Sequence, residues 1–289
     1  MAERASSSEV GNDAPVRLSP RALLRYSRHL IIPEVALAGQ ERLGNARVLV
    51  VGAGGLGSPV LEYLAAGGTG RIGIADDDVV DETNLQRQTL FATNDIGKKK
   101  VDVARDRLLA LNPLVAVDAI PLRVDATNAR ELVRLYDIVL DCTDRFEARY
   151  LINDACYLEN KPDVYASIVQ FRGQVSVFHP SLNRDAAKKN PCYRCLFPEP
   201  PAAGSVPTCA ESGVLGVLAG VVGTWQANEA LKFILNIGEP LIGRMLLIDT
   251  LAAAVREVRY ERDPGCVLCG DAPSISEIQP LNYDARLAF

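Results

Sequence analysis

The segment GAGGLGS holds three glycines at a spacing typical of a turn that binds phosphate groups. Gly52, Gly54 and Gly57 form a G-x-G-x-x-G pattern directly after the apolar run at residues 48–51. Glycines permit a tight turn and a close approach of the backbone to phosphate oxygens, and the start of a following helix favours an anion. Asp76 follows about twenty residues later, where a carboxylate can accept a hydrogen bond from a ribose hydroxyl. The pattern predicts a nucleotide site.

The polar residues after Asp76 indicate which nucleotide binds. Arg87 in TNLQRQTLF and Lys100 in GKKKVD carry cationic groups that can meet a triphosphate. Asp144 ends LDCTD, where a carboxylate suits Mg²⁺ bridging phosphate oxygens. Taken singly, the cations could be surface charges and Asp144 a helix cap. An NAD-dependent oxidoreductase and a nucleotide-binding scaffold without turnover remain alternatives, although neither explains all three residues together.

Four of the cysteines form two C-x-x-C pairs, Cys192 with Cys195 and Cys266 with Cys269. Two such pairs supply the four thiolates of a tetrahedral zinc site. A thioredoxin-like redox pair is the first alternative, but such pairs follow a strand at a helix start, whereas Cys192 follows Lys-Lys-Asn-Pro. A disulfide framework is the second, and disulfides are rare in the cytoplasm. The spacing favours a structural zinc site.

The remaining cysteines differ in their surroundings. Cys142 and Cys156 fall on a predicted buried strand and a helix, which favours core packing. Cys209 lies in VPTCAE, at the end of a proline-rich segment and ahead of a glycine-rich helix. A thiol there can be exposed, and a nearby helix start lowers its pKa. Cys209 is therefore a candidate nucleophile.

Predicted strands and helices alternate along the first half of the chain. Strands are expected at residues 48–51 and in RIGIADDD, VAVDAIP and DIVLDCTD, with helices from residue 56, near 98–111, at 127–135 and near 146–160. Such alternation is typical of an α/β fold with a doubly wound, Rossmann-like parallel sheet. Ligands bind such sheets at the carboxyl ends of the strands, where the polar residues above are expected.

The second half extends this sheet into a mixed one. VYASIVQ and GQVSVFHP are predicted to be adjacent strands joined by a tight turn at Arg172 and Gly173, and RMLLIDT and EVRYE to be two more. Residues 181–208 are interpreted as a mobile crossover loop, because long irregular segments are usually functional or mobile. Residues 212–228 are predicted to be a buried helix in which Gly216 and Gly220 let another element approach closely.

Composition excludes several classes of protein. The 289 residues are 48% apolar and 23% charged, with a net charge of -5, which argues against a basic nucleic-acid or membrane-surface binder. The only two histidines, His29 and His179, are too few for a Ser-His-Asp triad or a multi-histidine metal site. The first residues carry no apolar core typical of a signal peptide, and residues 212–228 are short and polar for a membrane span. We expect a cytoplasmic protein.

The order of the motifs GAGGLGS, TNLQRQTLF, GKKKVD, LDCTD, PCYRC, VPTCAESGVLG and PGCVLCG resembles the MoeB/ThiF family, from residue 20 to about residue 275. The resemblance implies an enzyme that uses ATP to adenylate the C-terminal glycine of a ubiquitin-like sulfur carrier protein ending in Gly-Gly. Some relatives continue into a rhodanese domain that supplies sulfur. We expect a separate sulfur donor here, and a pathway such as molybdopterin synthesis, thiamin synthesis or tRNA thiolation.

The resemblance also implies roles for particular residues. Asp76 would hold the ribose and Asp144 would serve magnesium binding and catalysis. The residues implied to contact the phosphates or otherwise bind the nucleotide are Gly55, Asp78, Thr83, Asn84, Leu85, Gln86, Arg87, Lys100 and Arg145. Arg28, in the R-Y-x-R motif near the amino terminus, would reach the partner's ATP site in a homodimer. Cys209 would carry the activated carrier or sulfur covalently.

We therefore predict a flexible tail at residues 1–17 and a single adenylation domain at residues 18–289. Its nucleotide-binding half is expected at about residues 46–145, and its carrier-binding and zinc half at about residues 146–275. A helix is expected to begin at Ser19-Pro20, since serine caps helices and proline suits their first turn.

Overall fold

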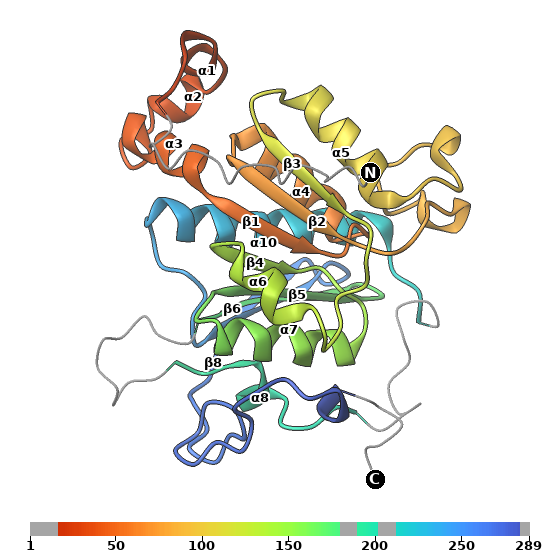
Figure 1. Cartoon of the computed structure of the whole chain (residues 1–289), viewed down its shortest axis with the longest axis vertical. Coiled ribbons are helices and arrows are strands. Elements are labelled where there is room, and N and C mark those ends of the chain that lie inside the picture. The colour runs from red at the N-terminus through yellow and green to blue at the C-terminus, as the bar shows by residue number, and fades with distance from the viewer. Residues whose placement is uncertain (1–16, 180–189, 202–211, 284–289) are drawn as a thin grey trace, which may run out of the picture.

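The computed structural model describes residues 17–179, 190–201 and 212–283. Within these ranges eight strands form one sheet in the order β3-β2-β1-β4-β5-β6-β7-β8 (Figure 1). The parallel strands are β1 (Arg47–Val51), β2 (Arg71–Ala75), β3 (Ala116–Ile120), β4 (Ile138–Asp141) and β5 (Asp163–Val169). The antiparallel ones are β6 (Arg172–Phe178), β7 (Arg244–Asp249) and β8 (Ala254–Arg259). The predicted doubly wound sheet with a mixed extension is confirmed.

Helices cover both faces of this sheet. Val48 and Val50 of β1 share one core with α4 (Gly57–Gly67), α5 (Lys100–Leu111) and α10 (Gly216–Leu235). Leu49 and Val51 point the other way, into a core with α6 (Ala129–Arg134) and α7 (Phe146–Leu158). A strand covered on both faces has apolar residues at every position, which explains the run VLVV.

Between residue 17 and the sheet lie three helices: α1 (Pro20–Arg25), α2 (Ser27–Leu30) and α3 (Ala36–Asn45). The predicted cap is present, since the Ser19 hydroxyl accepts a hydrogen bond from the amide of Ala22 at 3.2 Å. The sequence interpretation missed α3. Arg25 donates to the carbonyl of Leu111 at the end of α5, and β3 begins shortly afterwards. These helices therefore lie toward the amino ends of the strands.

The hairpin between β5 and β6 corrects one prediction. Val169 pairs with Arg172 and Ile168 with Gly173, so both Arg172 and Gly173 lie inside β6 and the turn is at residues 170–171. Gly173 is needed for packing rather than for turning, because a Cβ there would collide with Val222 of α10. Glycine has a turn signature in sequence, but here it admits a helix close to the sheet.

The other described elements are short: α8 (Tyr193–Leu196) and the 3₁₀ turns η1 (Glu82–Asn84), η2 (Thr93–Asp95) and η3 (Pro280–Tyr283). Of the predicted crossover loop, residues 190–201 are described and contain α8; its other residues, and the tail at 1–16, lie outside the described ranges. Among the described helices, none combines the length and the apolar character needed to cross a bilayer.

Candidate active site and metal centre

The glycine turn connects the end of β1 to α4 and needs glycine for space. Gly52 has φ of 97°, and a Cβ on it would lie 2.8 Å from the carbonyl oxygen of Cys142. A Cβ on Gly57 would collide with the carbonyl of Gly52. The backbone is thus folded tightly where α4 begins, and the amides near the helix start are placed to meet an anion.

A cavity of about 480 Å³ opens at the carboxyl ends of β1, β2 and β4. The sequence-predicted residues that line it are Gly52, Gly54, Gly55, Asp76, Asp78, Asn84, Arg87, Lys100, Asp144 and Arg145. Four other predicted residues, Gly57, Thr83, Leu85 and Gln86, are outside this lining. The cavity has the size of an ordinary ligand pocket and collects polar groups from distant parts of the chain.

Asp76 lies just beyond β2 and is held rigidly. Its carboxylate accepts hydrogen bonds from the amide of Ala53 in the glycine turn at 2.7 Å and from the amide of Asp78 at 2.8 Å. Burial raises the pKa of the Asp76 carboxyl above its usual value, while Lys100 and the two amides oppose that rise. The carboxylate is fixed beside the turn, in the position expected for a ribose partner.

Two cations reach the cavity from separate segments. Lys100 is the first residue of α5, and its ammonium lies 2.8 Å from the Asp78 carboxylate. The guanidinium of Arg87 donates to the carbonyl of Thr83 at 3.1 Å. Thr83, outside the lining, therefore orients Arg87 through its backbone. Both cations face the cavity that contains the glycine turn, where they can offset phosphate charge.

Asp144 is exposed at the rim, in the segment that follows β4. The turn before it is held by Asp141, whose carboxylate accepts hydrogen bonds from the Thr143 amide at 2.9 Å and the Thr143 hydroxyl at 2.6 Å. Asp141 is fully buried, which raises the pKa of its carboxyl, with Arg149 acting in the opposite direction. Asp141 supports the segment, while Asp144 is free to meet a ligand from solvent.

Two further predicted residues are not part of this cavity. Arg28 is exposed on α2, toward the amino ends of the strands, whereas the cavity lies at their carboxyl ends. Cys209 lies outside the described residues. The buried positions of Cys142 and Cys156 agree with the expected core packing.

Other cavity residues were missed by sequence reasoning. Gln88, Arg123, Thr143, Arg149 and Val214 all line it. Arg149 left a detectable signal: it is a basic residue among the buried positions of α7, and its guanidinium lies over the rings of Phe146 and Tyr165. Val214 left none, because it reaches the cavity only through the path of the chain before α10.

The two cysteine pairs meet beside α8. The sulfur of Cys192 lies 3.9 Å from that of Cys195 and 3.7 Å from that of Cys266, and the sulfurs of Cys195 and Cys269 are 3.2 Å apart. All four sulfurs lie within 4.8 Å of one another. Tetrahedral zinc, with Zn–S bonds of about 2.3 Å, places its sulfurs about 3.8 Å apart. The four cysteines fit such a site.

Comparison with known proteins decides the family. The ThiF family matches residues 26–268 of this chain, which is most of its length. The chain belongs to the ThiF family. The resemblance predicted from the motifs is thereby confirmed. The matched residues include the nucleotide cavity and three of the four clustered cysteines, and the match ends one residue before Cys269.

Several relatives of this ThiF-family chain are named for their activity. A sulfur carrier protein adenylyltransferase of Thermus thermophilus is 52% identical over 271 residues, covering 93% of this chain and 98% of that protein. The SAMP-activating enzyme E1 of Haloferax volcanii is 45% identical and covers 92% of this chain and 95% of its own. The probable adenylyltransferase/sulfurtransferase MoeZ of Mycobacterium tuberculosis is 49% identical, but this chain spans only 64% of it.

Solved structures of the MccB protein of E. coli share the fold. The structure described as MccB with ATP superimposes with a TM-score of 0.70 and 26% identity, covering 80% of this chain and 69% of that one. The structure described as MccB with MccA-N7isoASN superimposes with a TM-score of 0.74 and 28% identity, covering 86% of this chain and 75% of that one. The ThiF-family chain thus has the architecture of a protein that was crystallised with ATP.

Proposed function

We propose that this protein adenylates the C-terminal glycine carboxylate of a ubiquitin-like sulfur carrier protein, forming an acyl-adenylate and pyrophosphate from ATP. The observation that carries the proposal is the cavity that gathers the glycine turn, Asp76, Arg87, Lys100 and Asp144. The names of the two relatives matched over nearly their whole lengths point to the same reaction.

Different cavity residues would contact the ribose and the phosphates of ATP. Asp76, fixed by the amides of Ala53 and Asp78, would accept hydrogen bonds from the ribose hydroxyls. The glycine turn would approach the phosphates, and Arg87 and Lys100 would neutralise them. The triphosphate would thereby be held with its α-phosphorus toward the open rim, where a carrier carboxylate can arrive.

The reaction needs no general base, because the attacking carboxylate is already ionised at neutral pH. The carboxylate oxygen forms a bond to the α-phosphorus, and the bond to the pyrophosphate oxygen breaks. Arg87 and Lys100 would stabilise the charge on the transferring and departing phosphates. Because no general base is needed, an enzyme with only two histidines can carry out the reaction.

Magnesium and zinc would play different parts. Asp144, exposed at the cavity rim, would hold Mg²⁺, which when bound neutralises phosphate charge. The four cysteines would hold Zn²⁺ as a structural ion, since closed four-thiolate sites leave no open position for a substrate. The zinc would fasten α8 to the segment around Cys266 and so stabilise the second half of the chain.

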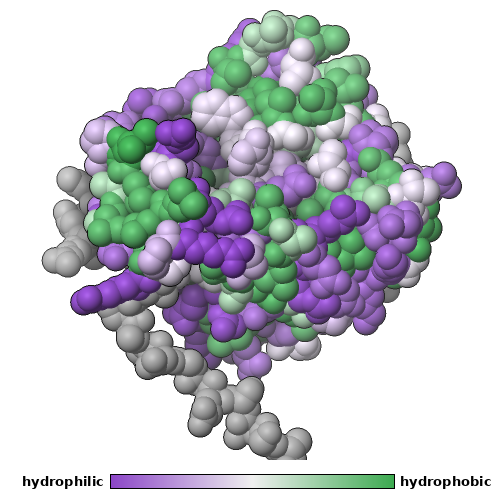
Figure 2. Space-filling view, turned by 90° about the horizontal axis from the view of Figure 1, so that it is seen from above, coloured by the Kyte–Doolittle hydropathy of each residue, from purple (hydrophilic) through white to green (hydrophobic). Residues whose placement is uncertain are grey.

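A homodimer would complete the site with Arg28 of the partner subunit. Arg28 lies near the opposite end of the strands from its own cavity, so it cannot serve that cavity directly. The helices α1–α3 also expose apolar side chains, including Leu24 and Ile31. Figure 2 shows hydrophobic residues gathered on the side where these helices lie. A second copy of the chain would cover them.

The dimer proposal has a direct test by mixing two inactive subunits. A heterodimer of an Arg28→Ala subunit and an Asp144→Ala subunit contains one site with both residues intact only if Arg28 acts on its partner. Exchange should return in the heterodimer and be about 10²-fold lower in either homodimer. If no activity returns although the heterodimer forms, Arg28 does not act in trans.

Sulfur transfer would follow adenylation. The Cys209 thiolate, or a persulfide that a separate donor has formed on it, would attack the acyl carbon of the adenylate and AMP would leave, so that the carrier is held on Cys209 as a thioester or an acyl disulfide. Cys209→Ala should then keep ATP-pyrophosphate exchange and lose thiocarboxylate formation on the carrier. Thiocarboxylate formation at the wild-type rate would exclude this role. Loss of exchange as well would place Cys209 in the adenylation step.

The proposed function is tested by ATP-pyrophosphate exchange with candidate carriers that end in Gly-Gly. Labelled pyrophosphate should enter ATP only when enzyme, carrier and Mg²⁺ are all present. A carrier that lacks its terminal glycine is the matched control and should give no exchange. Exchange that ignores the carrier, or binding of NAD with hydride transfer and no exchange, would refute the proposal.

A further inference from the structure

The helix α10 packs against two of the segments that line the nucleotide cavity, the glycine turn and the segment that contains Gln86 and Arg87. A Cβ on Gly216 would collide with the carbonyl of Gln86, and the methyl of Ala219 is 3.2 Å from where a Cβ on Gly55 would lie. A Cβ on Gly223 would lie 2.7 Å from the carbonyl oxygen of Leu56. By contrast, the predicted close approach at Gly220 is wrong, since nothing described lies within 4 Å of a Cβ built there.

One polar side chain extends from this helix into the sheet. Gln226 has 0% of its surface exposed, and its amide nitrogen donates to the carbonyls of Asp141 at 2.8 Å and Val164 at 2.7 Å. Its amide oxygen lies 3.4 Å from the sulfur of Cys142. A buried amide pays a large desolvation penalty unless it is paired, and here both of its ends have partners.

The hydrogen bond from Gln226 to Asp141 lies at the carboxyl end of β4. Asp141 is the last residue of β4, and its pairing with Tyr165 is the last in the ladder between β4 and β5. Beyond it the backbone leaves the sheet through Cys142 and Thr143 to Asp144. Gln226 therefore holds the carbonyl at which the strand ends, while Thr143 is hydrogen-bonded to the carboxylate of the same residue.

We propose that Gln226 is a positioning residue for adenylation, which sets the exit of β4 and thereby the place of Asp144. It touches neither the cavity nor a reacting group, so it acts through the segment 142–144. This inference rests on the proposed role of Asp144. A shift of about 1 Å at a catalytic group can cost about 10²-fold in rate, so a single buried clamp can matter greatly.

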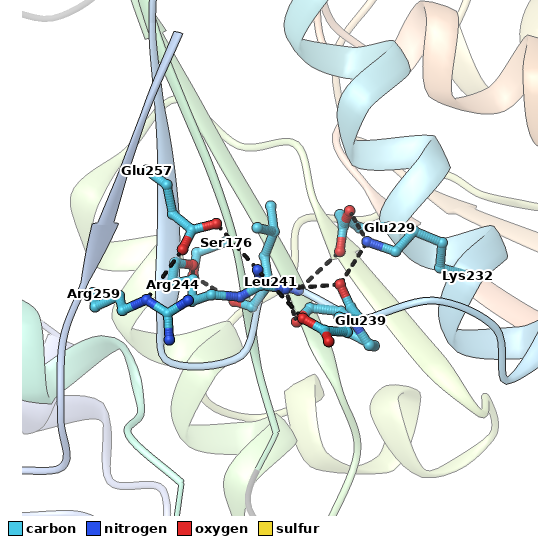
Figure 3. Close-up of polar contacts among 9 residues, drawn as sticks. Ser176, Glu229, Lys232, Glu239, Leu241, Arg244, Glu257 and Arg259 are labelled. Carbon is cyan, nitrogen blue, oxygen red and sulfur yellow. Dashed lines mark hydrogen bonds and ion pairs between the residues drawn. The ribbon is translucent and has the colours of Figure 1, made fainter.

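A matched control lies one turn further along the same helix. Glu229 is 1% exposed, and its carboxylate accepts from the Leu241 amide at 2.9 Å and from Lys232 at 2.7 Å. Figure 3 shows this group facing Glu239 and Leu241, in the connection that leads to β7. Glu229 anchors α10 to a different part of the sheet, so its loss should destabilise the fold without moving Asp144.

The experiment compares Gln226→Met, which keeps the side-chain volume and removes the donor, with Glu229→Gln. Gln226→Met should lower kcat for carrier-dependent exchange by about 10-fold or more, with KM for the carrier unchanged. Glu229→Gln should stay within about 2-fold of the wild type, even where both variants lower Tm. If Gln226→Met does not fold, Gln226→Asn is used instead. Its amide is one methylene shorter and is drawn back from the carbonyls of Asp141 and Val164, so the expected outcome is the same.

A double variant separates positioning from general damage. In an Asp144→Ala background, Gln226→Met should cause no further loss of exchange, because both changes remove the same contribution. Independent, additive losses would overturn the inference. So would exchange within about 2-fold of wild type in Gln226→Met, or equal losses in Gln226→Met and Glu229→Gln.

Hydrogen–deuterium exchange tests the inference without relying on activity. The amides of Cys142 and Thr143 are hydrogen-bonded in the intact protein, to Val51 and to Asp141. They should exchange about 10-fold faster in Gln226→Met and at the wild-type rate in Glu229→Gln. Unchanged protection in Gln226→Met would refute the role of Gln226. A wild-type protein inactive with every carrier would instead refute the proposed function, and the protection data would still stand.

Discussion

The ammonium of Lys100 lies 2.8 Å from the carboxylate of Asp78, with only 5% of the lysine side chain exposed against 66% of the aspartate. A nearly buried cation is thus held by a carboxylate that remains in water. Without the lysine, Asp78 stays solvated and the more buried Asp76 keeps its hydrogen bonds to the amides of Ala53 and Asp78, although its pKa should rise further. The pair keeps the cation at the cavity without making the fold depend on it.

We therefore predict that Lys100→Met lowers carrier-dependent ATP-pyrophosphate exchange by about 10²-fold or more while the protein still folds. Lys99→Met, a change at the exposed neighbouring lysine, is the control and should leave exchange unaffected. Initial rates of exchange and thermal melting of the two variants decide the matter. Equal rates in Lys100→Met and the wild type would remove Lys100 from the phosphate site.

Arg87→Ala and Asp144→Ala should each lower exchange by about 10²-fold or more and leave a measurable residual rate, because each is proposed to act on phosphate charge. Both side chains lie at the cavity surface, so circular dichroism and Tm should remain close to those of the wild type. Asp106→Asn removes an exposed carboxylate on α5 and serves as the control. Near-normal exchange in either alanine variant would show that the active site is elsewhere.

The cysteine cluster should bind one zinc ion per chain. Cys195→Ser should lose the ion and lower the free energy of unfolding by about 4 kcal/mol or more, since metal binding energy is folding energy in such sites. Cys156→Ser is the matched control: Cys156 is buried in the core of α7, so this change should cost stability and leave zinc bound. Metal-free protein that melts normally would contradict the assignment.

Stability should depend on pH through Asp163 at the start of β5. It is 2% exposed, and one of its oxygens has no hydrogen-bond partner among the described residues. Burial raises the pKa of this carboxyl well above its usual value, and nearby Asp141 raises it further. The folded protein therefore favours the protonated acid, and stability is lost as the pH rises above the unfolded pKa of about 4 toward the folded pKa.

Asp163→Asn removes this ionisation. The variant should gain stability relative to the wild type by at least about 1 kcal/mol between about pH 5 and about pH 8. Urea unfolding at the two pH values measures the difference. A difference that does not change with pH would mean that Asp163 is ionised, and paired, throughout. Asp137→Asn, at an exposed pair with Arg47, should show no such trend.

Much of the fold could be predicted because local patterns and tertiary packing agree. The run RVLVV is apolar at successive positions since both faces of β1 are covered, and the glycine turn that follows needs its glycines for space. The predicted turn at Gly173 was wrong for the converse reason. Its glycine is required by Val222, some fifty residues away in the chain, and no local pattern reveals such a contact.

In the candidate site, too, some residues belong to local sequence motifs and others are defined only by contacts between distant segments. Asp76, Arg87 and Asp144 were found because each belongs to a short motif, and the cavity indeed brings them together. Gln226 belongs to no such motif, and its partners Asp141 and Val164 come from two strands that are distant in the chain. Asp76, Arg87 and Asp144 can therefore be predicted from local motifs, whereas Gln226 is identified only from the packing of α10 against the sheet.

The most direct test of the account is the mass of the carrier protein itself. Enzyme, ATP, Mg²⁺ and a carrier ending in Gly-Gly should yield carrier heavier by one adenylyl group at its terminal glycine, with pyrophosphate released and no ADP formed. Asp144→Ala enzyme should leave the carrier unmodified. Conversion of ATP to ADP, or adenylyl groups attached equally to a carrier without its terminal glycine, would contradict adenylation of a carrier carboxylate as the activity of this protein.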